Sequence, residues 1–130
     1  MPVRELIIPP GMENIYEQKR YSPGVKVGNL IFVSGMLGRD ENLNIVFERE
    51  DQFVQLFENM GKVLTAAGAS FADVVDLTGY FTELQRDMSL FQTVRDRYIT
   101  GELPAQTLIG VTELSTPGLI LELKCTAAVA

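Results

Sequence analysis

The sequence has 130 residues, with 11 basic and 17 acidic side chains, no histidine and one cysteine. The absence of histidine excludes Ser-His-Asp and Cys-His catalysis. A single cysteine excludes an internal disulfide or a cysteine zinc cluster. The net charge of −6 argues against nucleic acid as a partner, because phosphates require a basic surface. We expect a single domain over residues 1–130, cytoplasmic and without a membrane partner, since no apolar run has the length of a signal or a membrane span.

The first part of the chain predicts short strands separated by turns. Residues 3–8 are expected to form an edge strand that ends at the Pro-Pro-Gly sequence of residues 9–11. The Gly-Asn pair at 28–29 lies between two apolar runs and predicts a two-residue hairpin turn. Residues 30–34 are apolar at nearly every position, which predicts a strand covered on both faces.

Two helices are predicted from the spacing of apolar residues. In residues 48–67 these fall at three- and four-residue steps, and Gly68 stands where a glycine ends a helix. The Ser70 to Asp73 spacing resembles a capping box for a single helical turn. The second helix is expected over residues 87–99, with Gly101 as its end.

The remaining segments complete a sheet. Residues 75–82 alternate in polarity, and two more strands are expected over 105–114 and 119–128. This order predicts an α+β fold, a mixed sheet with two helices on one face. Apolar residues occur on both faces of the strands, so the face without helices is expected to pack against copies of the same chain.

The last strand carries the most informative polar residue. By alternation, Cys125 shares a face with Leu121 and Leu123, and it is interpreted as a buried small apolar side chain. Glu122 lies on the other face, in the middle of an otherwise apolar strand, where a carboxylate needs a partner or a chemical role. An ion pair with Lys124 or with a basic residue on a helix is the alternative.

Other candidates have two readings each. Gln106 is a polar residue at a strand edge or a ligand contact, and Tyr21 is a surface aromatic or a catalytic phenol. Ser34, followed by Gly35 at the end of a buried strand, donates either to a ligand or to the backbone. Arg95 borders the apolar stripe of the second helix. These residues alone indicate an oligomeric α+β protein with a carboxylate-lined pocket.

Together, however, these segments resemble a known family. Residues 21–29 (YSPGVKVGN) and 30–35 (LIFVSG) resemble the N-terminal signature of the RidA/YjgF family of enamine/imine deaminases. Residues 104–107 (PAQT) and 121–123 (LEL) fall where its C-terminal signatures lie. The similarity covers residues 7–130, and the YjgH-type branch is the most similar one.

The resemblance implies a chorismate-mutase-like fold and a homotrimer whose sheets pack into a central barrel, with ligand clefts between subunits. Deaminating members hydrolyse reactive 2-imino or enamine acids to keto acids and ammonia, without cofactor or metal. In that family an arginine after Pro-Ala binds the substrate carboxylate, a glutamate on the last strand orients or activates water, and a tyrosine, a serine and backbone groups complete the site.

Residue by residue, the family tyrosine matches Tyr21, the serine Ser34 and the glutamate Glu122. The arginine is replaced by Gln106, and an asparagine of the second helix by Arg95. A neutral amide lacks the charged fork that binds a carboxylate, a loss of about 1.5–3 kcal/mol.

Two functions from different classes follow. The first is hydrolysis of a related imine, enamine or other small C–N metabolite, with Glu122 positioning water and Tyr21 and Ser34 donating hydrogen bonds. Gly35 and Gln106 would contact the substrate, and Arg95 would supply the missing cation. The alternative is a non-catalytic trimer that binds a small metabolite. An endoribonuclease or translation inhibitor is less favoured, because the net charge is −6.

Overall fold

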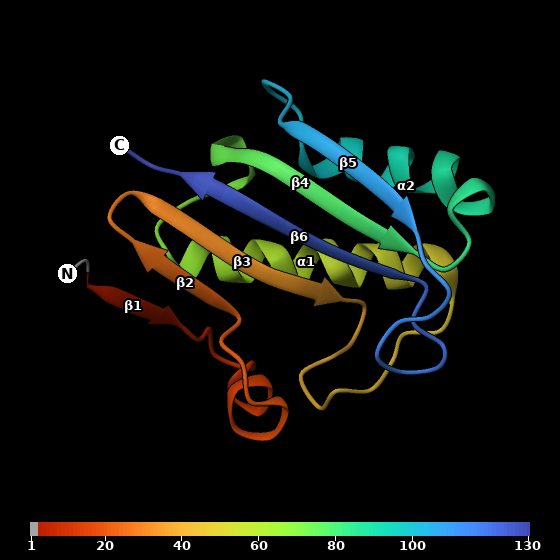
Figure 1. The fold of residues 1–130 in the computed structure, drawn as a ribbon, viewed down its shortest axis with the longest axis horizontal. Coiled ribbons are helices and arrows are strands. Elements are labelled where there is room, and N and C mark those ends of the chain that lie inside the picture. The colour runs from red at the N-terminus through yellow and green to blue at the C-terminus, as the bar shows by residue number, and fades with distance from the viewer. Residues whose placement is uncertain (1–2) are drawn as a thin grey trace.

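The computed structural model describes residues 3–130 as one six-stranded mixed sheet with two helices on one face (Figure 1). The strands are β1 (Arg4–Ile7), β2 (Gly24–Val27), β3 (Leu30–Leu37), β4 (Val74–Phe81), β5 (Ala105–Gly110) and β6 (Leu121–Ala128). The helices are α1 (Arg49–Ala66) and α2 (Leu84–Tyr98), with the short turns η1 (Ile15–Lys19) and η2 (Phe71–Asp73). The strand order is β1-β2-β3-β6-β4-β5, in which β4 and β5 are parallel and the other neighbours antiparallel. The predicted α+β class is confirmed.

Most local turn predictions are confirmed. Val27 pairs with Leu30 across the two-residue turn, in which Gly28 has a φ of 59°. Gly68 follows α1 with a φ of 82°, and Ser70 caps η2. The prediction that Gly101 ends the second helix is wrong: α2 stops at Tyr98 because the next residue is already extended.

Some helices and strands begin or end at other residues than predicted, where the local sequence pattern is weak. The helix α2 begins at Leu84 instead of 87, because Leu84 packs against the core. The strand β5 ends at Gly110 instead of 114, because its partner β4 ends at Phe81, whose carbonyl accepts from the N–H of Val111. Consequently residues 111–120 cross the end of the sheet, and β6 enters between β3 and β4.

The core lies between the sheet and the helices, and the opposite face of the sheet is open in the single chain. Ile31 and Val33 of β3 are buried beneath α1, whereas Leu30 and Phe32 are 39% and 46% exposed. Ile109 of β5 is also half-exposed on the open face. The prediction that residues 30–34 are covered on both faces therefore does not hold within one chain, because the helices lie on one side of the sheet only.

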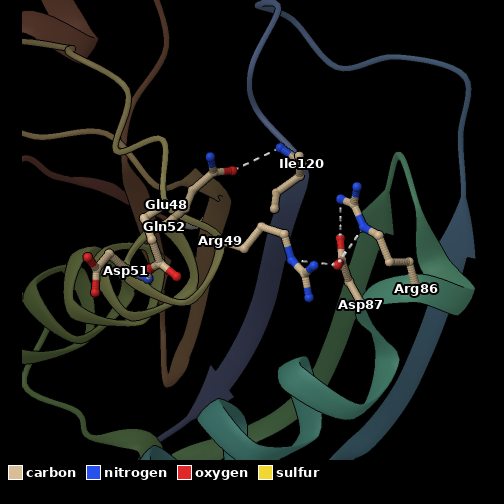
Figure 2. Close-up of polar contacts among 7 residues, drawn as sticks. All are labelled: Glu48, Arg49, Asp51, Gln52, Arg86, Asp87 and Ile120. Carbon is tan, nitrogen blue, oxygen red and sulfur yellow. Dashed lines mark hydrogen bonds and ion pairs between the residues drawn. The ribbon is translucent and has the colours of Figure 1, made fainter.

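The two helices are joined at their N-terminal ends by a buried carboxylate. Asp87 is fully buried, and its oxygens accept from Nε and Nη2 of Arg86, both at 3.0 Å (Figure 2). Arg49 of α1 approaches the same carboxylate with Nε at 3.1 Å. Two guanidinium groups thus compensate the desolvation of one carboxylate and fix α2 against α1.

A buried amide holds the two long loops at one end of the sheet. Gln52 of α1 donates from Nε2 to the carbonyls of Val46, at 2.9 Å, and Gly118, at 3.1 Å. Its Oε1 accepts from the N–H of Ile120 at 2.8 Å (Figure 2). Gln52 is fully buried, so these bonds tie loop 38–48 and loop 111–120 to α1. Both loops flank the end of the sheet where β3 ends and β6 begins (Figure 1).

Candidate functional site

Glu122 lies on the open face of the sheet, near the end where β6 begins and β3 and β4 end, and not in mid-strand as the sequence suggested. On β6 it pairs with Leu37 of β3 on one side and Tyr80 of β4 on the other. Its carboxylate lies over Gly35, where a Cβ atom would overlap the Glu122 side chain. Gly35 falls in an irregularity of β3 between Val33 and Met36. The missing side chain and the bulge together make room for the carboxylate.

Glu122 borders an open groove that contains four of the residues singled out from the sequence. The groove has a volume of about 730 Å³, and its lining includes Tyr21, Ser34, Gly35 and Glu122. Tyr21 enters it from the chain after η1, where Arg20 adopts a left-handed φ of 67° and ends the turn. The groove also contains three basic residues that no pattern in the sequence links to a site: Lys19, Arg39 and Lys124.

Burial is the main reason why the hydroxyl of Tyr21 stays protonated. Burial raises its pKa above the ordinary 10.0, the nearby Arg39 guanidinium lowers it, and the charge of Glu122 raises it again, with a net increase. A protonated phenol near a carboxylate is a hydrogen-bond donor at neutral pH. Tyr21 is therefore able to donate to an oxygen or nitrogen atom bound beside Glu122.

Ser34 uses its proton within the chain. Its Oγ donates to the carbonyl of Ser22 at 2.6 Å, and its backbone N–H donates to the carbonyl of Pro23 at 2.9 Å. These bonds hold the segment before β2 against β3. Of the two predicted roles of Ser34, the structure shows donation to the backbone, and a ligand beside Ser34 meets an acceptor.

The alternative interpretation of Glu122 was an ion pair. No ion pair among residues 3–130 includes Glu122, and Lys124 lies two residues further along β6 without bonding to it. The carboxylate therefore has no charged partner in the part of the chain described. It is half-buried and free to bind a water molecule or a ligand in the groove.

Gln106 and Arg95 form a pair elsewhere in the molecule. Gln106 of β5 is in register with Leu77, whose side chain is buried on the helix side of the sheet. Nη1 of Arg95 in α2 donates to Oε1 of Gln106 at 2.9 Å. The guanidinium also lies 5.7 Å from the centre of the Phe91 ring and 3.0 Å from an oxygen of Asp96. The cation of the helix therefore reaches position 106.

The sheet separates this pair from Glu122. Gln106 shares its face with Leu77 and the helices, whereas Glu122, in register with Tyr80, projects from the open face. A single chain consequently does not bring Gln106 and Arg95 together with Glu122. A site that uses both groups requires two copies of the chain.

Cys125 does not contribute to the groove chemistry. Its side chain is 2% exposed and packs in the core, which confirms the interpretation from alternation. Burial, followed by the charge of Asp76, raises the pKa of the thiol to about 12. At neutral pH it remains a protonated, unreactive thiol.

Comparisons with known proteins identify the family. The family model described as "Endoribonuclease L-PSP" matches residues 12–129. The "RutC family protein YjgH" of Escherichia coli (strain K12) is 31% identical over 130 residues, which cover 99% of this chain and 98% of that protein. A solved structure of YjgH has a TM-score of 0.89 and 31% identity, covering 97% of this chain and 96% of the other.

Some similar proteins carry enzymatic names. A "2-iminobutanoate/2-iminopropanoate deaminase" of Dermatophagoides farinae is 31% identical over 96 residues, which cover 72% of this chain and 74% of that protein. The chain thus belongs to the RidA/YjgF family, and it is YjgH-like, as its sequence segments predicted. Within the described residues 3–130, no helix is both long enough and apolar enough to cross a membrane.

Proposed function

We propose that this protein is a RidA-like hydrolase of a small imine, enamine or related C–N metabolite. The observation that carries the proposal is Glu122, a carboxylate without an ion-pair partner that lies over Gly35 in an open groove. The deaminase name of a similar protein supports the same reaction class. The substrate lies in a cleft between two copies of the chain in a homotrimer.

Two features support the shared cleft. Glu122 and the pair of Gln106 and Arg95 lie on opposite faces of the sheet, so only different copies present both to one ligand. The open face also exposes large apolar side chains such as Phe32 and Ile109, which packing between copies would cover.

The reaction needs one carboxylate and water. The oxygen of water adds to the carbon of a protonated C=N group while Glu122 accepts a proton from that water. The proton then passes from Glu122 to the amine nitrogen. The C–N bond breaks with its electron pair leaving on ammonia, the hydroxyl group gives its proton to Glu122 to become the carbonyl, and ammonia takes up that proton as it leaves, which restores the carboxylate. The products are a ketone or keto acid and ammonium. Tyr21 donates a hydrogen bond in this groove.

Gln106 and Arg95 set the specificity. Because Oε1 of Gln106 accepts from Arg95, its Nε2 group is left to donate to an oxygen of the substrate. The Arg95 guanidinium lies beside the same position and supplies positive charge there, although Asp96 offsets part of it. The pair replaces the single arginine with a weaker anchor for a carbonyl or carboxylate oxygen.

The test is release of ammonia from a panel of imines that includes 2-iminobutanoate. We expect turnover by the wild-type protein, a loss of at least 100-fold in Glu122→Ala, and unchanged turnover in Glu102→Ala, an exposed carboxylate outside the groove. No turnover by folded wild-type protein across the panel would contradict the proposal. Metabolite binding at Gln106 without product would instead support the non-catalytic alternative.

A further inference from the structure

Arg39 is a buried cation without an acidic partner. It follows β3 and is 8% exposed, and its carbonyl accepts from Nδ2 of Asn59 at 2.8 Å. No ion pair among residues 3–130 includes it. The adjacent Asp40 carboxylate instead accepts from the N–H groups of Asn42 and Asn44, both at 2.9 Å.

Such an arrangement is costly unless a ligand completes it. A guanidinium removed from most of its water needs compensation by an anion or by acceptor atoms. In the described part of the chain, no fully buried side-chain nitrogen or oxygen lacks a hydrogen-bond partner. The Arg39 guanidinium lies against the Tyr21 hydroxyl. Any of its nitrogens that has no hydrogen-bond partner is reached by solvent, and Arg39 lines the groove beside Tyr21 and Glu122.

The groove is positively charged although the protein is acidic. Its lining contains Lys19, Arg39 and Lys124 against the single carboxylate of Glu122, a balance of 3 − 1 = +2, while the whole chain has a net charge of −6. Basic side chains gathered in a groove favour anionic ligands and raise their local concentration. The volume of about 730 Å³ also leaves room beyond a four-carbon acid.

We propose that Arg39 binds a second acidic group of the substrate, so that the site takes a dicarboxylic imino acid in preference to a monocarboxylic one. The inference rests on the proposed function for the identity of the reacting group. The pair of Gln106 and Arg95 of one copy contacts the oxygen atoms next to the C=N group. Arg39, which lines the same groove as Glu122 in the other copy, binds the distal carboxylate through the planar fork of its guanidinium.

Calorimetric titration with two keto acids tests this without requiring turnover. 2-Oxoglutarate and 2-oxobutanoate are product analogues that differ in the second carboxylate. We expect the wild-type protein to bind 2-oxoglutarate about tenfold more tightly or better, as a charge-assisted contact provides. Arg39→Gln removes this preference and leaves the affinity for 2-oxobutanoate unchanged. Arg97→Gln, which removes a surface ion pair with Glu50 on the helices, keeps the preference.

The outcomes separate the two proposals. Equal affinities in the wild-type protein, or a preference that survives Arg39→Gln, overturn the role of Arg39 even if imines are hydrolysed. A preference that depends on Arg39 in a protein that hydrolyses no imine upholds the role and overturns the proposed reaction. Thermal melting controls for folding. Should Arg39→Gln not fold, Arg39→Lys retains the charge without the fork, and the preference must fall below the wild-type value.

Discussion

Substitution Gln106→Arg restores the residue that the family resemblance implies, and the structure predicts that it destabilises this chain. Nη1 of Arg95 lies 2.9 Å from Oε1 of Gln106, so a second guanidinium would lie about 4 Å from the first. At that separation two like charges repel by about 1 kcal/mol in water and about 4 kcal/mol near a protein surface. The lost hydrogen bond adds about 1 kcal/mol, and Asp96 offsets part of the repulsion.

The expected decrease in the free energy of unfolding is therefore about 1–4 kcal/mol. Adding Arg95→Asn removes the repulsion, so the double variant should be more stable than the sum of the two single effects predicts. Urea unfolding of the wild type, both single variants and the double variant, at one protein concentration, gives this coupling energy. Arg97→Asn is the matched control because Arg97 pairs with Glu50 and should combine additively with Gln106→Arg. Additive effects of positions 95 and 106 would refute the reasoning.

Three further predictions follow from single positions. Gly35→Ala should abolish most turnover while the protein stays folded, because the added Cβ displaces the carboxylate of Glu122. The rate of ammonia release measures this effect, and full activity would contradict it. Gln52→Leu leaves two carbonyls and one N–H without partners, so the free energy of unfolding measured in urea should fall by about 3–5 kcal/mol. A fall of less than about 1 kcal/mol would be too small for the hydrogen bonds described. Burial raises the Cys125 pKa from 9.0 to about 12, so the unfolded chain loses its thiol proton first. The contribution of Cys125 to the free energy of unfolding is therefore fully present below pH 9 and is lost as the pH rises toward 12, by up to about 1.4 kcal/mol per pH unit. Cys125→Val should reduce this slope, with the part due to the raised pKa values of Tyr21 and Tyr98 remaining, and equal slopes would contradict the assignment.

Features set by neighbouring residues were readable from the sequence. The apolar steps of α1, the glycine after it and the turn at Gly28 depend on interactions within a few residues, and the structure confirms them. Alternation along β6 also placed Glu122 and Cys125 on opposite faces correctly. The glycine at position 101 failed because the helix ended before it, at Tyr98.

Features that depend on distant segments were not readable. Arg39 lies in a loop without periodicity, and its burial results from the packing of that loop on Asn59 and Gln52 of α1. Likewise, the separation of Gln106 from Glu122 follows from the pairing of β4 with β5 and with β6, which aligns Gln106 with Leu77 and Glu122 with Tyr80. Strand order of this kind joins residues from both ends of the chain, and no local pattern specifies it.

The central claim, that Glu122 of one copy acts with Gln106 of another, is tested most directly by mixing two inactive variants. Glu122→Gln and Gln106→Ala are each expected to release little ammonia from the best imine of the panel. When equal amounts of both variants are unfolded and refolded together, about a quarter of the sites between copies should have an intact Glu122 from one copy and an intact Gln106 from another. Recovery of about a quarter of wild-type turnover is the predicted result. A mixture as inactive as its components, or an active Glu122→Gln protein, would contradict the claim.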